Sequence, residues 1–530
     1  MKLADRSGIE KTTKIIDVQE TALSRRVRHH TDQYPGQSGV YPLVSGKDAL
    51  NARLALIAAA EKTLDLQYYI WHRDHTGKLL SSCLLDAADR GVRVRLLLDD
   101  VGSPIGDERL LLLSQHVNID IRLFNPLLSR VRRLWSMVWN YGRANRRMHN
   151  KSLTADNTVT LVGGRNIGDE YFEAGGQVDF ADLDIMAIGP VVDQASDGFD
   201  EYWNSDISCP IELISHKKFT VKELASANRN YREHFREYTH SSWIDDFLKI
   251  DDVQSTTSDH GESQTNPDGR SEADIATKWY WSKASIMYDH PDKVLGRGFG
   301  KFKSLSSQLA ELSNSVSQEL LLVSPYFIPG RAGLEYFSLL RSRGVNITIL
   351  TNSLAATDVG AVHSGYAKYR KRLLKMGVAI YEACSEQDVL SQKPKLRKRI
   401  RRWAFRRKNR ADHAMPITRS ARASLHAKAF FIDQQKTFVG SMNLDSRSLL
   451  INTEIGVLVD NPEMTREAVD DIMMSLPGNS YQLTLDKGNK LVWILHREDG
   501  DVRFYSEPQA TVFQRVAVWL MARFPIESQL

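Results

Sequence analysis

The hydrophobic and polar positions of the chain predict the same order of helices and strands twice. In the first half, a helix rich in alanine and leucine leads into a strand of alternating apolar and polar residues, and a second helix and two apolar strands follow. The second half predicts strand, helix, strand, helix and strand. The predicted elements are helix 47–62, strand 64–71, helix 77–91, strand 92–98 and strand 117–124 in the first half, and strand 319–327, helix 334–343, strand 345–350, helix 359–375 and strand 378–381 in the second.

Strands that alternate with helices and are joined by short turns are typical of α/β units on a parallel or mixed sheet. The stretches RGVRVRLLLDD and RGVNITILTN occupy equivalent places in the two halves. We therefore expect two similar α/β repeats, separated by a linker that contains a nearly apolar-free, disordered segment. The predicted organisation is an N-terminal arm (1–40), repeat one (41–210), a linker (211–280) with the disordered segment (254–274), repeat two (281–475), and a C-terminal hairpin with an amphipathic helix (476–530).

The composition, 42% hydrophobic and 25% charged over 530 residues, is that of a globular protein with more than one domain. Cys83, Cys209 and Cys384 lie far apart without CxxC spacing, which argues against a disulfide framework or a zinc knuckle and favours a reducing compartment. The chain has no apolar run of about eighteen residues, and its N-terminus lacks the apolar core of a secretory signal. We expect a soluble or peripheral intracellular protein.

The net charge of the chain is a modest +5, but two of its segments are strongly basic. Residues 393–410 hold eleven Lys or Arg in eighteen positions, too many for a core helix, and favour a surface that meets the phosphates of lipid or nucleic acid. Residues 127–148 combine an apolar stripe with arginines, so a packed helix and a phosphate-facing helix are both consistent with them. The amphipathic stretch 509–524 leaves the same choice between a membrane contact and a packed helix.

Two nearly identical motifs carry the candidate chemistry. The pattern HxKxxxxD occurs once in each repeat, and each occurrence is followed at the same offset by a small-residue turn that ends in asparagine, GGRN at 163–166 and GSMN at 440–443. Such a coincidence indicates a duplication built around a paired site. The candidate catalytic residues are His149, Lys151, Asp156, His426, Lys428 and Asp433.

Spacing separates the roles of these residues. A histidine and a lysine two positions apart on an extended segment project from the same face. The aspartate lies seven positions after the histidine and off that face, so we expect it to have an orienting or structural role. After each turn, backbone amides and the polar side chains of Asn166, Ser441 and Asn443 are candidates for binding a phosphate.

Two histidines and two lysines around one cavity suit the chemistry of a phosphodiester. The lysines neutralise the non-bridging oxygens, one imidazole attacks phosphorus, and the other protonates the leaving oxygen. We expect neither a metal nor another cofactor, because an ammonium beside each imidazole would repel a cation.

At these residues the sequence resembles the phospholipase D superfamily over both repeats, roughly 41–475. The resemblance implies two α/β repeats related by a pseudo-twofold axis that share one active site. It also implies that His149 is the nucleophile and His426 the general acid and base, although the sequence alone does not fix that order. In the family a carboxylate holds each histidine; by position after the turns, Asp182 matches His149 and Glu454 matches His426.

Several phrases resemble the bacterial cardiolipin synthases that lack N-terminal membrane helices. They are LQYYIW at 66–71, RRMHNKSLTADNTVTLVGGRNIGDEYF at 146–172, SPYFIPG at 324–330, LTNSLAATDVGAVHSGY at 350–366 and the C-terminal FPIESQL. The resemblance implies phosphatidyl transfer to phosphatidylglycerol, with phosphatidylethanolamine as a further candidate substrate. It implies a peripheral position on the anionic cytoplasmic face of the bacterial inner membrane, and a small macrodomain-type protein as a candidate partner.

Three other functions stay open on the sequence. Water as the acceptor would make the protein a phospholipid hydrolase. Basic segments also suit a metal-independent nuclease, although no nucleic-acid motif is present and we expect no nucleic acid as partner. A non-catalytic lipid-binding scaffold is disfavoured because both motifs are intact. His363 and Tyr366 are candidates to line the substrate site, and a packed helix face explains them as well.

Overall fold

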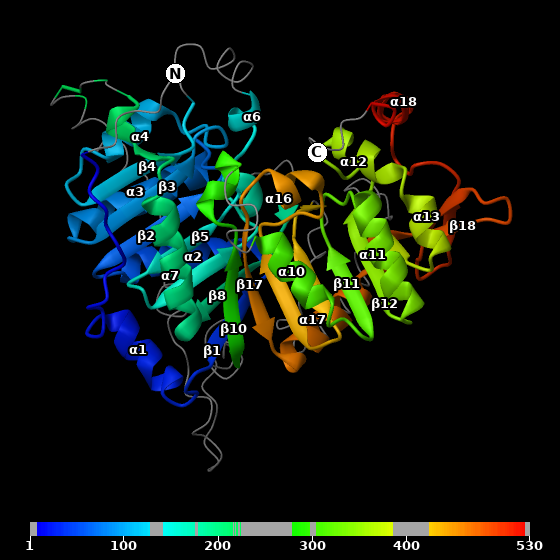
Figure 1. The fold of residues 1–530 in the computed structure, drawn as a ribbon, viewed down its shortest axis with the longest axis horizontal. Helices are drawn as coiled ribbons and strands as arrows, with labels where there is room; N and C mark the ends of the chain where they lie inside the picture. The colour runs from blue at the N-terminus through cyan, green and yellow to red at the C-terminus, as the bar shows by residue number, and fades with distance from the viewer. Residues whose placement is uncertain are drawn as a thin grey trace.

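The computed structural model describes residues 8–127, 141–174, 179–215, 217, 219–220, 223, 278–296, 304–384 and 423–524. It shows two halves side by side, the N-terminal half in blue to blue-green and the C-terminal half in green to red (Figure 1). The predicted disordered segment 254–274, the basic segment 393–410 and most of the basic segment 127–148 lie outside the described residues.

The strands of the two halves follow the same spatial order. In the first half it is β9-β4-β3-β2-β5-β6-β8-β1, and in the second β18-β13-β12-β11-β15-β16-β17-β10. The first-half strands are β1 (Ser38–Leu43), β2 (Thr63–Tyr68), β3 (Arg93–Asp99), β4 (Ile119–Phe124), β5 (Ser152–Ala155), β6 (Val159–Gly163), β8 (Asp184–Ile188) and β9 (Ser208–Pro210). Those of the second half are β10 (Tyr280–Tyr288), β11 (Glu319–Val323), β12 (Asn346–Asn352), β13 (Ala379–Ala383), β15 (Ala429–Ile432), β16 (Lys436–Gly440), β17 (Ile455–Asp460) and β18 (Ser480–Leu485).

Each half-sheet is mixed. Strands β2, β3 and β4 are parallel, as are β11, β12 and β13, and the remaining pairings within each half are antiparallel. Antiparallel pairing of β1 with β10 joins the two half-sheets, through Ser38–Ser282 and the next two residue pairs. The expected arrangement of two similar α/β repeats is confirmed.

Helices cover the sheets and close three large cores. Helices α2 and α3 bury their apolar side chains on the first half, and α10 and α11 on the second. Helices α7 and α17 pack into a central core with strands of both halves. Among the described residues, the α-helices are α1 (Ala22–Thr31), α2 (Gly46–Ala59), α3 (His75–Asp89), α4 (Asp107–Leu113), α6 (Tyr141–Ala144), α7 (Pro190–Trp203), α10 (Leu305–Ser313), α11 (Gly330–Ser342), α12 (Gly360–Ala367), α13 (Arg370–Lys375), α16 (Ser446–Leu450), α17 (Pro462–Ser475) and α18 (Val512–Met521).

The structure departs from the sequence expectations in several places. Strand β1 begins within the predicted arm, and β18 extends the second half-sheet beyond the predicted end of repeat two at 475. The predicted helix 359–375 is divided into α12 and α13, and the predicted N-terminal arm contains helix α1, whose Leu23 and Val27 are buried in the first-half core. The predicted C-terminal hairpin is present as the antiparallel strands β19 (Leu491–Leu495) and β20 (Val502–Phe504). Among the described residues, none of the helices is both long and apolar enough to cross a bilayer.

Two further strands connect the halves across the centre of the molecule. Strand β7 (Asp179–Ala181) belongs to the first repeat and β14 (Ala423–Leu425) to the second, and they pair in parallel with Ala181 opposite Leu425. A matching parallel bridge joins Met148 to Thr453. Both connections end one residue before a motif histidine or a candidate carboxylate, so they determine which side chains meet in the site.

Candidate active site

Each motif histidine contacts a carboxylate of the opposite repeat, an arrangement that we call the carboxylate exchange. His426 Nδ1 lies 2.5 Å from Asp182 Oδ2, and His149 Nδ1 lies 2.8 Å from Glu454 Oε2. The expectation that Asp182 holds His149 and Glu454 holds His426 is therefore wrong, because position after the turn gives the repeat to which a carboxylate belongs but not the histidine that it contacts.

The parallel connections between the halves explain the exchange. The Ala181–Leu425 pair places the next residues, Asp182 and His426, side by side, and the His426 N–H donates to the Ala181 carbonyl at 2.8 Å. The Met148–Thr453 bridge does the same for His149 and Glu454, and the His149 N–H donates to the Thr453 carbonyl at 2.8 Å. Each histidine is thus fixed at its backbone and at its ring by the opposite repeat.

The two carboxylates differ in charge. Burial raises the pKa of Glu454 to about 7 against the opposing effect of Lys151, and Glu454 Oε1 is buried without a hydrogen-bond partner among the described residues. Burial also acts to raise the pKa of Asp182, but the charges of Lys428 and His426 outweigh it and hold the pKa at about 2. At neutral pH, His426 therefore faces a fully ionised carboxylate, whereas His149 faces one that is partly protonated.

The histidines share one electrostatic environment. Burial lowers the pKa of His149 well below its usual value, and the charges of Lys151, Lys428, His426 and Arg447 lower it further. The pKa of His426 is also lowered by burial and by Lys428, but Asp182 opposes this shift. Groups from both motifs thus act on the same ring.

The two motif lysines are fully buried and lie beside their own histidines. Lys151 Nζ donates to the His149 carbonyl at 2.5 Å, and Lys428 Nζ donates to the His426 carbonyl. Burial lowers the pKa of Lys151 to about 7 and also lowers the pKa of Lys428. Two buried lysines whose charged forms a bound anion would stabilise give this site the chemistry of an anion receptor.

The motif aspartates lie at the start of strands rather than beside the histidines. Asp156 accepts N–H groups from Glu61, Lys62 and Thr63 at the beginning of β2, at 2.7–2.9 Å. Asp433 accepts N–H groups at 2.7–2.9 Å from Ser317, Gln318 and Glu319 at the beginning of β11, and it also accepts the Ser317 hydroxyl.

Backbone geometry explains why aspartate suits both positions. The two aspartates have φ of 47° and 51°, a left-handed conformation that aspartate tolerates better than most residues. Their inclusion among the candidate catalytic residues is not supported by these contacts, which fit the structural role that the spacing indicates.

The turn residues have different partners in the two repeats. Asn166 is buried; its Oδ1 accepts the Ile70 N–H and its Nδ2 donates to the Tyr171 hydroxyl. Ser441 donates to Glu454 Oε2 at 2.5 Å, and Asn443 Oδ1 is buried without a partner among the described residues. In this structure, Asn166 and Ser441 hold neighbouring protein groups, and the phosphate contacts assigned to the three turn residues stay predictions.

Gly164 occupies the position that corresponds to Ser441. A Cβ at Gly164 would approach Asp182 Oδ1 to 2.1 Å, so a side chain there would displace the Asp182 carboxylate. The first-repeat turn therefore leaves Asp182 without a hydroxyl donor, whereas the second-repeat turn supplies one to Glu454.

Aromatic rings around the imidazoles are the site residues that the sequence did not identify. Tyr69 meets His149 edge-on at 5.1 Å between ring centroids, and Phe180 stacks on His426 at 4.8 Å. Tyr171 meets His426 edge-on at 5.4 Å. The position of Tyr69 directly after strand β2 was the available signal, because polar and aromatic residues at strand ends commonly face a site.

His363 and Tyr366 belong to a buried network in the second repeat rather than to the histidine pair. Tyr366 donates to Glu382 Oε1 at 3.0 Å, and His363 Nε2 lies 3.6 Å from Glu507 Oε1. Arg370 contacts both carboxylates. The packed-helix explanation of His363 and Tyr366 therefore holds.

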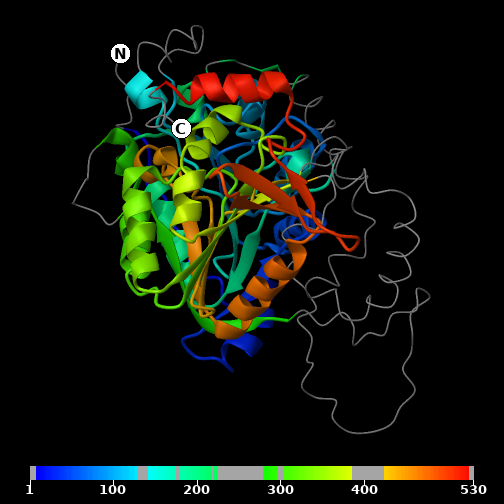
Figure 2. The same ribbon diagram turned by 90° about the vertical axis from the view of Figure 1, so that its right-hand side faces the viewer.

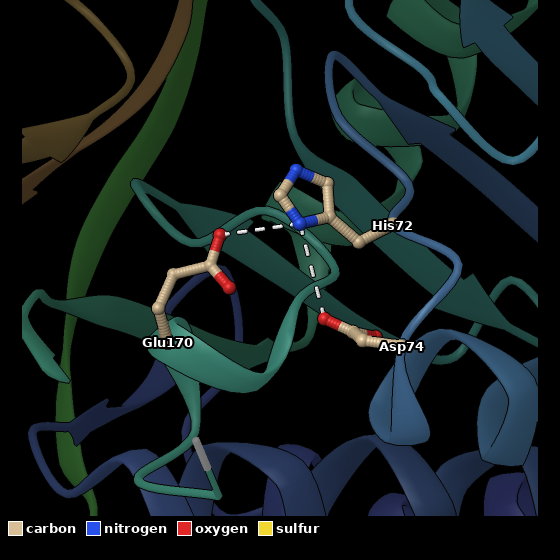
Figure 3. A group of neighbouring side chains, drawn as sticks. All are labelled: His72, Asp74 and Glu170. Atoms are coloured by element: carbon tan, nitrogen blue, oxygen red, sulfur yellow. Dashed lines mark ion pairs between the residues drawn. The ribbon is translucent and has the colours of Figure 1, made fainter. Parts of the chain in front are cut away.

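A separate group of possible metal ligands, His72, Asp74 and Glu170, lies at the start of α3 (Figure 3). His72 Nδ1 is 3.5 Å from Glu170 Oε1 and 3.8 Å from Asp74 Oδ2. Asp74 already accepts the Gly77 N–H with Oδ1, as the N-cap of α3, and the Asp169 N–H with Oδ2. These contacts account for the group as a connection between α3 and the turn that follows Asn166.

Comparisons with known proteins agree with this architecture. The family described as "Cardiolipin synthase, PLD-like domain" matches residues 54–203 and 309–474, one segment in each repeat. The chain belongs to this family, and it is an enzyme of the phospholipase D superfamily of the phosphatidyltransferase kind.

Particular relatives cover nearly the whole chain. It is 40% identical to cardiolipin synthase C of Escherichia coli over 93% of this chain and 97% of that protein. It is 22% identical to cardiolipin synthase B of Escherichia coli over 85% and 83%. A phosphatidylserine synthase from Haemophilus influenzae has a similar fold, with a TM-score of 0.55 at 11% identity over 95% of this chain and all of that one.

The positions of the motif aspartates predict that Asp156→Asn lowers stability more than turnover. Loss of the charge weakens hydrogen bonds to the start of β2, and we expect the free energy of unfolding to fall by about 1–3 kcal/mol. Urea unfolding measures this change, and the folded variant should retain turnover within about tenfold of the wild type.

Asp433→Asn is the matched variant in the other repeat. Because amide donors lower the pKa of Asp433, its contribution to stability is present at neutral pH and is lost as the pH falls through the acid range.

A fully folded Asp156→Asn enzyme with turnover reduced by about two orders of magnitude would instead place the Asp156 carboxylate in the reaction.

The unequal carboxylates predict unequal pH profiles for two isosteric variants. Asp182→Asn should lower kcat/KM by about a hundredfold or more from about pH 6 to pH 9, because Asp182 is ionised throughout that range. Glu454→Gln should cost little near pH 6 and progressively more above pH 7, because Glu454 is mainly protonated below its pKa of about 7. Equal losses with parallel pH profiles would contradict the difference in charge.

Proposed function

We propose that this enzyme is a cardiolipin synthase that transfers a phosphatidyl group through a phosphohistidine at His149, with phosphatidylglycerol as the acceptor. The single observation that supports the proposal is the pair of histidine–carboxylate contacts, 2.5 and 2.8 Å long, in which each motif histidine meets a carboxylate of the opposite repeat. The 40% identity to cardiolipin synthase C of Escherichia coli supports the choice of lipid.

The first half of the reaction forms the covalent intermediate. The free ring nitrogen Nε2 of His149 attacks the phosphorus of a donor phospholipid, and the bond from phosphorus to the head-group oxygen breaks. His426 gives a proton to that oxygen, so the head group leaves as an alcohol. Lys151 and Lys428 offset the charge that develops on the non-bridging oxygens, and binding of this anion favours their charged forms.

The second half regenerates the enzyme. His426 removes a proton from a glycerol hydroxyl of phosphatidylglycerol, and the resulting oxygen attacks the phosphorus. The bond from phosphorus to His149 breaks, which releases cardiolipin and a neutral imidazole. His426 loses one proton to the departing head group in the first half and regains one from the phosphatidylglycerol hydroxyl in the second, so the cycle is balanced.

The charges around the rings support this order of roles. A nucleophilic imidazole must be neutral, and His149 is surrounded by cations and paired with a carboxylate that is partly protonated at neutral pH. A general acid must hold a proton before it gives it away, and the ionised Asp182 opposes the lowering of the His426 pKa by burial and Lys428, so His426 keeps a proton more readily than His149. His149 therefore suits nucleophilic attack, and His426 suits proton transfer.

Incubation of the purified protein with vesicles of phosphatidylglycerol and phosphatidylethanolamine should yield cardiolipin, detected by mass spectrometry, and His149→Ala should yield none. His496→Ala is the matched control, because His496 lies in the C-terminal hairpin region and bonds Asp501 and Gln482. EDTA in the buffer should leave the rate unchanged, because lysines supply the positive charge.

Other products would overturn the proposal in distinguishable ways. Phosphatidic acid as the main product would make the protein a hydrolase, and cleavage of DNA in EDTA would make it a nuclease. Full cardiolipin formation by His149→Ala, or a rate that depends on an added divalent cation, would contradict the proposed mechanism.

A further inference from the structure

Helix α18 carries an apolar face that the protein leaves exposed. Six of the fourteen large apolar side chains exposed in the described part of the chain lie within residues 512–524. They are Val512, Phe513, Val516, Trp519, Leu520 and Phe524, with exposed fractions from 49% to 82%. Such a concentration on one short element marks an interaction surface, because soluble proteins usually scatter exposed apolar residues singly.

The opposite side of α18 is packed on the second repeat. Val518 is buried against Leu354 and Ala510, and Met521 is partly buried beside them. The helix is capped by reciprocal hydrogen bonds between Thr511 and Gln514. Because the helix is formed and fixed, its exposed face is a built feature of the fold.

A buried ion pair holds the chain segment that leads into α18. Glu507 Oε1 accepts from Arg370 Nη2 at 2.5 Å, and Arg370 is itself buried between Glu507 and Glu382. This pair ties the start of the helix to α13, so the apolar face has a fixed direction relative to the rest of the enzyme.

The location of α18 relates it to the active site. Helix α18 lies along the same edge of the molecule as α6, α12 and α16 (Figures 1 and 2). The loop that contains Leu354 continues to Ala356, whose carbonyl accepts the Ser424 hydroxyl at 2.8 Å, two residues before His426. The same loop contains Asp358, which accepts from the hydroxyl of Tyr326. One short loop therefore connects the underside of α18 to the neighbourhood of His426.

The chemistry of the face selects a phospholipid bilayer over a soluble partner. Residues 508–524 contain Arg515 and Arg523 and no acidic residue. The Arg523 guanidinium lies 3.2 Å from the centroid of the Trp519 ring. Helices that lie in the interface of anionic bilayers are amphipathic. They carry an apolar face, with tryptophan and arginine at its polar boundary.

We propose that the exposed face of α18 docks the enzyme on an anionic phospholipid bilayer and thereby holds the active site beside the lipid surface. The inference rests on the proposed function for the choice of a bilayer as the partner. Docking through Phe513, Val516 and Trp519 buries the apolar face and brings Arg515 and Arg523 to the phosphates.

A fluorophore on α18 tests this proposal without any turnover. Val516→Cys and, as the matched control, Leu339→Cys on α11 are each labelled with an environment-sensitive dye in the His149→Ala background. Both positions are exposed, at 49% and 56%, whereas the three native cysteines are buried. With vesicles of phosphatidylglycerol and phosphatidylethanolamine, the dye at 516 should shift to the blue and be shielded from an aqueous quencher, and the dye at 339 should be unchanged.

A second measurement uses the unlabelled enzyme. The double variant Phe513→Ser and Trp519→Ser should lower the partition coefficient of the enzyme onto vesicles by roughly tenfold or more. Two large apolar side chains then no longer enter the bilayer. Leu339→Ser should leave binding unchanged. Turnover of the double variant should fall on vesicles and persist on lipid dispersed in detergent.

Three results would overturn the proposal. They are an unshifted dye at 516, equal shifts at 516 and 339, and a shift at 516 that appears without vesicles as the protein concentration rises. The last result would assign the face to a second copy of the chain. Vesicle binding through α18 with no cardiolipin formed would instead contradict the proposed reaction and leave the docking surface intact.

Discussion

The active site depends on the exchange of carboxylates between the two repeats. In neither half does the carboxylate contact the motif histidine of the same half. Asp182 of the first repeat contacts His426 of the second, and Glu454 of the second contacts His149 of the first. Both contacts lie one residue beyond a parallel backbone connection between the halves. The pairing of β1 with β10 and the shared central core keep these connections in register. A single repeat would therefore have a histidine with no carboxylate to orient it.

Duplication gives the site its symmetry, and small differences in sequence remove it. The turn glycine Gly164 admits Asp182 at close range, and Ser441 in the equivalent turn donates to Glu454. Lys428 lies 3.9 Å from Asp182, whereas Glu454 keeps one oxygen unpartnered within the described structure. Burial raises the pKa of Glu454 to about 7 although Lys151 and Ser441 oppose it, whereas Lys428 and His426 outweigh burial at Asp182 and hold its pKa at about 2. Two equivalent imidazoles thereby acquire different environments, which a reaction with one nucleophile and one acid requires.

Much of this arrangement could be predicted from the sequence. The two HxKxxxxD motifs and the repeated strand and helix pattern indicate the α/β repeats and the residues that face one another. The seven-residue spacing also places Asp156 and Asp433 away from the histidines, at the start of β2 and β11. These features are local, because a strand's alternation and a turn's residues depend on neighbours in the chain.

The partners of the histidines could not be predicted in the same way. His426 and Asp182 are 244 residues apart, and β7 and β14 are only three residues long, too short for a hydrophobic pattern to fix their pairing. The amphipathic stretch near the C-terminus was equally ambiguous, because periodicity shows an apolar face without showing what covers it. In the structure, Val518 turns inward and the larger apolar side chains stay outside.

The location of the covalent intermediate tests the central claim most directly. The enzyme is mixed with phosphatidylethanolamine, quenched rapidly at alkaline pH and digested, and the peptides are analysed by mass spectrometry. The account predicts a phosphatidyl adduct on His149, which is absent in His149→Ala and is lost from the wild type when phosphatidylglycerol is added as the acceptor. An adduct on His426, or adducts shared equally between the two histidines, would contradict the division of roles that the exchanged carboxylates impose.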